Sequence, residues 1–328
     1  MTWTIERILN YPEDKPWGQG YAQYGFHDSR GNRYFFDYFH HWVGRLGTDA
    51  EFVWTAGVRA DVKTGLHMDA DFILPMFLTE SPDGSLLISC AGNARIFKLD
   101  LDARAVRLFI DAAALGLKDI SSTVYDDQGN LWISEVTGCR VWRLDPSGRV
   151  METLGDGRPG FQAETVPFEQ ARFRWIYVMK KGPDGRLYVL DSTNFAVRRI
   201  DIRMRTVETI IGTGKGGYAG DGGDARGATL GSDPNERFDG PYGLCVDEHG
   251  NLFIADTYNH IVRVVDARTN VISTIAGRHA VIPHQRNDPR EANPLNLNLP
   301  KLSALDYYAG RLFIPEWDGD LIILRRTN

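Results

Sequence analysis

A short unit that recurs along the chain constrains its fold more than any other sequence feature. The segment DEHGNLFIADTYNHIVRVVD aligns with DDQGNLWISEVTGCRVWRLD when Gly250 is placed over Gly129, and SPDGSLLISCAGNARIFKLD and GPDGRLYVLDSTNFAVRRID fit the same frame. Weaker copies lie near both ends of the chain. The six copies are marked by the turn glycines Gly31, Gly84, Gly129, Gly185, Gly250 and Gly310.

Each recurring glycine is suited to a tight hairpin turn, because a residue without a Cβ adopts positive φ at no steric cost. The residues that follow are rich in Ile, Val, Leu and aromatic side chains, which is the composition of β-strands. Helical periodicity is nearly absent. Six units of four strands predict an all-β, six-bladed β-propeller that forms a single domain over residues 1–328.

The two ends of the chain predict how this ring closes. The last copy ends after three strands, whereas the chain begins with TWTIERIL, which is similar to the fourth strands VETIIG and VISTIAG. We therefore expect the N-terminal strand to complete the last blade.

The copy around Gly250 resembles an NHL repeat. The residues that carry the resemblance are Pro241, Gly243, Val246, Asp247, Gly250, Asn251, Leu252, Ile254, Ala255, Asp256, Thr257, Asn259 and His260. The Gly-rich segment 212–230 also resembles the connection between NHL blades. The resemblance implies the propeller fold, and it says little about function because one scaffold carries many chemistries.

Charge and hydropathy exclude some classes of binding partner and some cellular locations. A net charge of -6 and a pI near 5.8 argue against a nucleic-acid partner, because such binding rests largely on a basic surface. Glu6 and Glu13 interrupt the place where a signal peptide would be apolar, and no apolar run is long enough to span a membrane. We expect a cytoplasmic protein without membrane association, and its three cysteines, which lack CxxC spacing, to be buried and reduced.

The two faces of the predicted ring differ in kind. One face carries short turns of similar length, and the other carries long, dissimilar connections, such as residues 155–174 and 277–300. Long irregular loops on a rigid scaffold often carry function. The sequence therefore predicts a site on the long-loop face, close to the central axis.

The first residue of the second turn in each copy forms one predicted ring of side chains: Asp37, Cys90, Glu135, Asp191, Asp256 and Glu316. In NHL repeats the aspartates of this ring are structural, whereas Glu135 and Glu316 depart from the pattern and are candidate catalytic residues, as is His40. The segment HMDAD offers His67, Asp69 and Asp71 as ligands for a divalent cation, Ca²⁺, Mg²⁺ or Zn²⁺. Against this, three residues on a loop are a weak metal signal.

The top of the innermost strands supplies the remaining candidates. Tyr177 and Tyr242 are candidate acids, and Arg172 and Arg174 could hold the carboxylate of a small substrate. The alternative is that the tyrosines only plug the channel mouth.

Two functions fit these patterns. The first is a small-molecule enzyme, a lyase, hydrolase or isomerase that uses acid–base groups with or without a divalent metal. The fold is similar to that of strictosidine synthase-like, gluconolactonase-like and peptidyl-amidating lyase propellers. The second is a non-catalytic scaffold that binds a protein or peptide, as many NHL domains do. No nucleotide-binding or serine-hydrolase motif is present, so no organic cofactor is expected.

Overall fold

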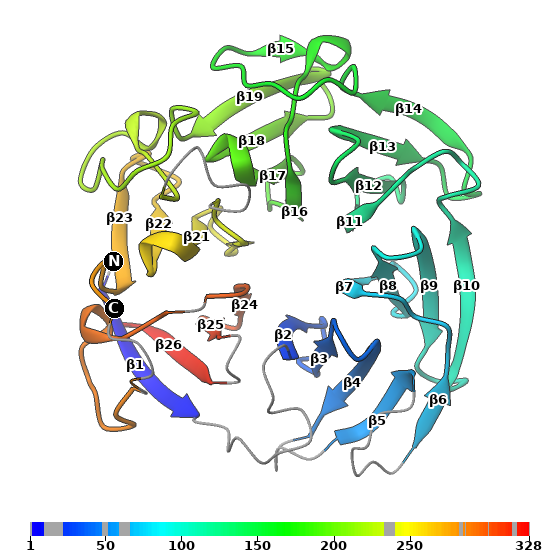
Figure 1. Ribbon diagram of the computed structural model, residues 1–328, viewed down its shortest axis with the longest axis horizontal. Coiled ribbons are helices and arrows are strands. Elements are labelled where there is room, and N and C mark those ends of the chain that lie inside the picture. Colours follow the sequence, from blue (N-terminus) through cyan, green and yellow to red (C-terminus); the bar gives the residue numbers. More distant parts are fainter. Residues whose placement is uncertain are drawn as a thin grey trace.

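Six β-sheets surround a central axis (Figure 1). The recurring glycines lie in the turn between the two innermost strands of each sheet. The structure is a computed structural model that describes residues 2–9, 22–47, 52–58, 66–232, 240–281, 285, 287–300, 302–316 and 320–327. All six glycines have φ between +74° and +82°, a conformation that glycine adopts without strain. The predicted six-bladed propeller is confirmed.

We label the four strands of each blade a to d, in order from the axis outward. Blades 1 to 3 contain β2 (Ala22–His27), β3 (Arg33–Asp37), β4 (Trp42–Leu46) and β5 (Phe52–Gly57); β7 (Pro75–Glu80), β8 (Leu86–Cys90), β9 (Arg95–Asp100) and β10 (Ala105–Asp111); and β11 (Ile120–Tyr125), β12 (Leu131–Glu135), β13 (Arg140–Leu144) and β14 (Val150–Leu154). Blade 1 carries a fifth, parallel strand, β6 (His67–Asp69), on its outer edge.

Blades 4 to 6 follow the same order. They contain β16 (Ile176–Lys181), β17 (Leu187–Asp191), β18 (Ala196–Asp201) and β19 (Thr206–Ile211); β20 (Gly243–Val246), β21 (Leu252–Asp256), β22 (Ile261–Val265) and β23 (Ile272–Gly277); and β24 (Asp306–Tyr308), β25 (Arg311–Pro315), β26 (Leu321–Thr327) and β1 (Thr2–Leu9). The short β15 (Val166–Pro167) pairs with β19 on the outside of blade 4.

The N-terminal strand closes the ring, as the sequence predicts. Strand β1 pairs antiparallel with β26, in a register that runs from Thr2 opposite Thr327 to Leu9 opposite Leu321. Blade 6 is thus built from both ends of the described chain, which lie side by side in Figure 1.

The hydrophobic core lies between the blades rather than within one central cluster. In the described part of the chain, six clusters of buried apolar side chains each draw on two adjacent blades. The cluster between blades 6 and 1, for example, joins Phe313 and Ile323 to Phe35 and Trp42. Such packing fixes the blades against one another and leaves the axis free for other side chains.

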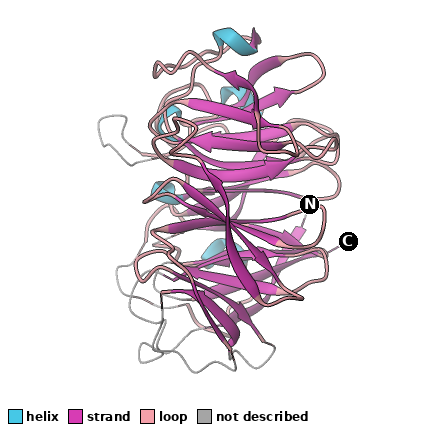
Figure 2. Cartoon of the chain, turned by 90° about the vertical axis from the view of Figure 1, so that its right-hand side faces the viewer, coloured by secondary structure: helices cyan, strands magenta, loops and turns pink. Residues whose placement is uncertain are grey.

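The two faces of the ring are distinct (Figure 2). The a–b and c–d turns form what we call the turn face, and the b–c turns and the connections between blades form the loop face. Cys90, Cys139 and Cys245 are buried and form no disulfide, as expected. No helix among the described residues is long and apolar enough to cross a bilayer.

Candidate functional site

A cavity of about 800 Å³ opens at the axis on the turn face. It is lined by the ends of the innermost strands of blades 1 to 4 and by the turns that follow them. This position differs from the predicted one, which was the loop face. The physical reason lies in the aromatic side chains of the innermost strands, described below, which fill the channel on the loop-face side.

Several ionisable side chains at this cavity occupy one position of the repeat, four residues before the turn glycine. In chain order the six blades place the following residues there: His27, Glu80, Tyr125, Lys181, Val246 and Asp306. The first four line the cavity, and the sixth contacts the first. The valine of blade 5 shows that the fold accepts an apolar side chain at this position. The repeat itself therefore does not require an ionisable side chain at this position.

His27 and Asp306 form a buried pair between blades 1 and 6. His27 Nδ1 lies 2.6 Å from Asp306 Oδ2, and the two side chains are only 4% and 9% exposed. The imidazole stacks on Tyr308 with ring centroids 5.0 Å apart, and it lies 4.3 Å from the ring of Phe313. A carboxylate on one ring nitrogen fixes the tautomer and orientation of an imidazole, which is how acid–base histidines are positioned in enzymes.

Glu80 of blade 2 and Lys181 of blade 4 line the cavity, and each charged group is fixed by polar contacts. The two carboxylate oxygens of Glu80 accept hydrogen bonds from the backbone N–H and the hydroxyl of Ser29, each over 2.7 Å. Lys181 Nζ lies 2.6 Å from Asp127 Oδ1. The adjacent Lys180 also lines the cavity.

Tyr125 brings a phenol to the same wall. Burial raises the pKa of Tyr125, and the nearby carboxylate of Asp83 acts in the same direction. The phenol is therefore protonated near neutral pH and can donate a hydrogen bond to a ligand.

Hydroxyl groups tie the lining strands of blades 2, 3 and 4 to one another. Thr79 Oγ1 donates to the carbonyl of Thr123 over 2.7 Å, and Ser122 Oγ donates to the carbonyl of Met179 over 3.3 Å. The cavity wall is therefore a rigid polar surface rather than a set of mobile loops.

Aromatic rings close the channel above the cavity. The rings of Tyr177 and Tyr242 lie 5.0 Å apart, and Phe77 of blade 2 meets Tyr177 of blade 4 edge to face at 5.6 Å. Ser121 Oγ of blade 3 donates to the carbonyl of Tyr177. This arrangement is the plug that the sequence offers as the alternative for Tyr177 and Tyr242. The two predicted substrate-binding arginines lie elsewhere on the loop face, where Arg172 is 3.4 Å from Asp156 and Arg174 is exposed.

The remaining catalytic candidates do not reach this cavity. Glu135 is buried and accepts hydrogen bonds from the backbone N–H of Lys118 and from Trp142 Nε1, so its carboxylate holds the loop-face end of blade 3. His40 contacts Asp37 over 2.8 Å, and its side chain is mostly exposed. Glu316 is buried at the end of β25 on the loop face, with its backbone N–H bonded to the carbonyl of Asp320.

Two of the three predicted metal ligands meet and the third lies apart, since His67 Nε2 is 3.4 Å from Asp69 Oδ1. His67 and Asp69 lie on β6 at the outer edge of blade 1, where His67 Nδ1 bonds to Thr55 Oγ1 over 2.8 Å. Asp71 lies 3.6 Å from Arg95 instead. Within the described ranges, no three His, Cys, Asp or Glu side chains are grouped so that they could hold a metal ion. The residues therefore do not fit the expected cation, and we derive no chemistry through it.

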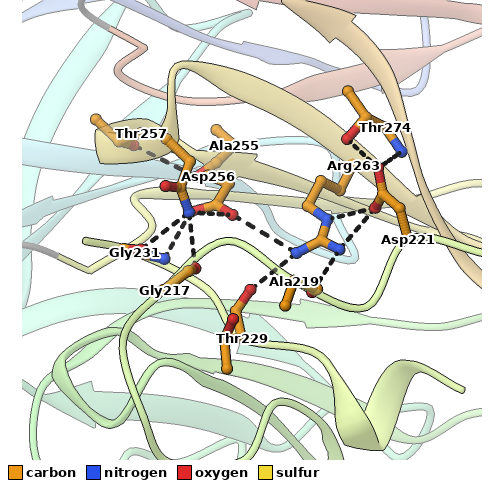
Figure 3. A network of polar contacts seen from close by, with 11 residues as sticks. Gly217, Ala219, Asp221, Thr229, Gly231, Ala255, Asp256, Thr257, Arg263 and Thr274 are labelled. Carbon is orange, nitrogen blue, oxygen red and sulfur yellow. Dashed lines mark hydrogen bonds and ion pairs between the residues drawn. The ribbon is translucent and has the colours of Figure 1, made fainter. Parts of the chain in front are cut away.

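Asp256, of the predicted acidic ring, is structural (Figure 3). Its carboxylate accepts hydrogen bonds from the backbone N–H of Gly231, over 2.7 Å, and from Asn259, over 3.0 Å. Arg263, which is fully buried, lies 3.8 Å from this carboxylate and 2.6 Å from that of Asp221. The network fastens the connecting loop to blade 5.

Blade 4 repeats this network around Asp191. Its carboxylate accepts from the backbone N–H of Arg174 over 2.9 Å and from Asn194 over 2.8 Å, and it lies 3.2 Å from Arg198. The structural role that the NHL resemblance assigns to Asp191 and Asp256 agrees with these contacts.

The residues of the cavity were missed because they lie on the face with the shorter turns. A signal was present in the sequence, since five of the six residues that stand four positions before a turn glycine are ionisable. His27, Glu80 and Asp306 all occupy that position.

The fold and the cavity together define a six-bladed β-propeller with a closed ring and a polar central cavity. Residues 238–265 match the NHL repeat family model. The chain thus contains an NHL repeat within a six-bladed β-propeller.

Curated relatives share part of the chain. Over 140 residues it is 37% identical to the chloroplastic protein SUPPRESSOR OF QUENCHING 1 of Arabidopsis thaliana, a match that covers 40% of this chain and 12% of that protein. It is 34% identical over 90 residues to NHL repeat-containing protein 2 of Homo sapiens, covering 27% of this chain and 11% of the relative. The matched segments thus span only about an eighth or less of these relatives.

Solved structures match over the whole chain at low identity. A catalytically inactive virginiamycin B lyase from Staphylococcus aureus with quinupristin has a TM-score of 0.58 and 12% identity, and the match covers 99% of this chain and 100% of that one. An auxiliary nutrient binding protein from Bacteroides ovatus has a TM-score of 0.67 and 12% identity, covering 100% and 77% of the two chains. These likenesses show the fold alone.

Proposed function

We propose that the protein is a small-molecule enzyme that performs acid–base chemistry in the central cavity of the turn face. The observation that carries the proposal is the set of ionisable side chains at one repeat position, with His27 and Asp306 in contact at 2.6 Å. The reaction class is that of a lyase, hydrolase or isomerase that moves a proton without an organic cofactor. A cavity of about 800 Å³ is within the size range of small-molecule sites.

Each lining group has a distinct part in this proposal. Asp306 holds Nδ1 of His27 and so fixes the orientation of the imidazole that exchanges a proton with the substrate. Glu80 is the second candidate base, and Tyr125, kept protonated by burial, donates a hydrogen bond to a substrate oxygen. Lys180 and Lys181 line the same cavity as Glu80, Asp126 and Asp127, so its wall carries both signs of charge and suits a polar substrate.

The solved structures and the relatives found by sequence support different functions. The virginiamycin B lyase likeness supports it at the level of the fold only, because identity is 12%. The matches to NHL repeat-containing proteins support the alternative, a scaffold that binds a protein or peptide. The buried His27–Asp306 pair beside the cavity favours the enzyme, since a surface that only docks a partner needs no such pair.

The proposal is tested by incubating the protein with a library of small polar metabolites and following each compound by proton NMR. We expect at least one compound to be converted, and His27→Gln to slow its conversion by roughly 10²-fold or more, the usual contribution of a general acid or base. His249→Gln, on an exposed turn of the same face, is the matched control and should leave the rate unchanged. Conversion by His27→Gln at the wild-type rate would overturn the role of His27. Binding without any conversion would support a non-catalytic binder instead.

A further inference from the structure

Four blades carry an arginine or a lysine at the same position of strand c. The groups that surround this side chain can therefore be compared from blade to blade. The four residues are Arg45, Lys98, Arg143 and Arg199. In blades 3 and 4 the residue directly opposite on strand d is a glutamate. Arg143 lies 3.0 Å from Glu152, and Arg199 lies 2.5 Å from Glu208. These blades satisfy the cation with a carboxylate across the strand pair.

In blade 2 the cation forms an ion pair with a turn residue, and in blade 1 it forms no ion pair within the described residues. Lys98 lies 2.6 Å from Asp83 of the a–b turn. Arg45 has Trp54 opposite it on β5, and no carboxylate in the described part of the chain forms an ion pair with it. The Nε atom of Arg45 is buried and has no hydrogen-bond partner among the described residues, as is also true of Arg143, so blade 1 differs in lacking the carboxylate. A buried donor without a partner is unfavourable, so this position is one where an acceptor is needed.

A cavity of about 340 Å³ adjoins Arg45 on the outer part of the turn face, between blades 1 and 2. Two further arginines line it, Arg30 on the a–b turn of blade 1 and Arg104 on the c–d turn of blade 2, and neither is ion-paired within the described ranges. Asp100 and Asp102 lie on the same rim. The Asp100 Oδ1 atom accepts hydrogen bonds from the backbone N–H groups of Asp102 and Ala103, at 3.0 and 2.8 Å, so this oxygen caps its own turn.

The rest of the cavity wall is apolar. Trp54, which is 8% exposed, stands where blades 3 and 4 have a glutamate and forms one side, and Leu66, Met68 and Leu99 also line the cavity. The site therefore combines unpaired guanidinium groups with a hydrophobic surface, the composition of pockets that hold small organic anions.

We propose that this cavity binds a small organic carboxylate with an apolar body. Its carboxylate takes the place that Glu152 and Glu208 fill in blades 3 and 4 and accepts hydrogen bonds from Arg45, and its apolar body packs on Trp54 and Met68. Arg30 and Arg104 add long-range attraction at the rim. The site is separate from the central cavity and does not depend on the function proposed for it.

Octanoate is a suitable probe because it carries both features, and isothermal titration calorimetry of the full chain measures its binding. We expect acetate, which lacks the apolar body, and 1-octanol, which lacks the charge, to bind at least tenfold more weakly. Arg45→Gln should weaken octanoate binding roughly tenfold or more. Arg107→Gln, an exposed arginine on the outer strand of blade 2, is the matched control and should bind as wild type does. The double variant Arg30→Gln/Arg104→Gln alters only turn residues and provides a second test if Arg45→Gln fails to fold.

A second pair of variants uses the internal comparison. Trp54→Glu restores the carboxylate that blades 3 and 4 place opposite the cation, so the protein should occupy its own anion site and octanoate binding should be lost. Trp54→Gln removes the same ring without adding charge and should keep measurable binding that acetate does not match. The proposal would be overturned if wild type does not bind octanoate at millimolar concentration. Unchanged binding in both Arg45→Gln and the double turn variant would overturn it too.

Discussion

The guanidinium of Arg263 lies 2.6 Å from the carboxylate of Asp221, which belongs to the loop that enters blade 5 (Figure 3). Glu164 occupies the corresponding place in the loop that enters blade 4, but its side chain is exposed. The blade 4 arginine, Arg198, is as deeply buried as Arg263, and its Nε and Nη2 atoms have no hydrogen-bond partner within the described ranges. Two copies of one network thus differ in how completely they satisfy the buried cation.

We predict that the two arginines contribute unequally to stability. Arg263→Met leaves both Asp256 and Asp221 without their cation and should cost about 3–5 kcal/mol. Arg198→Met leaves only Asp191 and also removes two unsatisfied nitrogens, so its cost should be smaller. Urea unfolding at neutral pH measures both. An equal or larger loss for Arg198→Met would contradict the interpretation.

The pH dependence of stability should report on Asp256. Burial raises the pKa of Asp256 from 3.8 to about 6, although hydrogen bonds from Asn259 and Gly231 oppose the shift. Because the folded state holds this proton more tightly than the unfolded state, the contribution to stability is complete below pH 3.8 and is lost as the pH rises through about 6. Wild type should therefore lose up to about 3 kcal/mol relative to Asp256→Asn between pH 4 and pH 7. Parallel pH profiles for the two proteins would exclude this origin.

Gly138 is predicted to be required by the buried carboxylate of Glu135. A Cβ at Gly138 would lie 1.9 Å from Glu135 Cδ, and Glu135 is held by Trp142 and by the backbone of Lys118. Gly138→Ala should therefore destabilise the protein by about 1–3 kcal/mol. Gly227→Ala is the control, because a Cβ there meets nothing within 4 Å and its φ is not positive. Thermal unfolding of the two variants distinguishes this steric requirement from a general effect of removing glycine.

The fold could be predicted from the sequence because it depends on local features that recur. A turn glycine such as Gly250 and the apolar alternation after it specify a hairpin without reference to the rest of the chain. The pairing of β1 with the last blade could also be predicted, because the last copy of the repeat contains only three strands. The site could not be predicted in the same way, since which face of the ring is hollow depends on how side chains from separate blades meet. Tyr177 and Phe77, from blades 4 and 2, fill the channel on one side, and their contact leaves no trace in either segment alone.

His67 illustrates the same limit for the expected metal site. Its spacing to Asp69 and Asp71 suggested three ligands on one side of an extended segment. The structure adds His67 and Asp69 to the outer edge of blade 1 as the parallel strand β6, which directs them away from the axis. Sequence spacing gives the local direction of side chains, whereas tertiary packing decides what they meet.

The closing strand should be essential for stability, and Trp3 provides the test. This residue of β1 is 6% exposed, packs in the cluster between blades 5 and 6, and meets Phe253 edge to face at 5.4 Å. Trp3→Ala should cost about 3–5 kcal/mol, as is usual for a buried tryptophan. The indole Nε1 of Trp3 is buried and finds no hydrogen-bond partner in the part of the chain that the structure describes, so Trp3→Phe removes an unsatisfied donor while it keeps an aromatic ring. We therefore expect Trp3→Phe to lie within about 1 kcal/mol of wild type in urea unfolding. If Trp3→Ala unfolded at the wild-type urea concentration, β1 would not hold the ring closed.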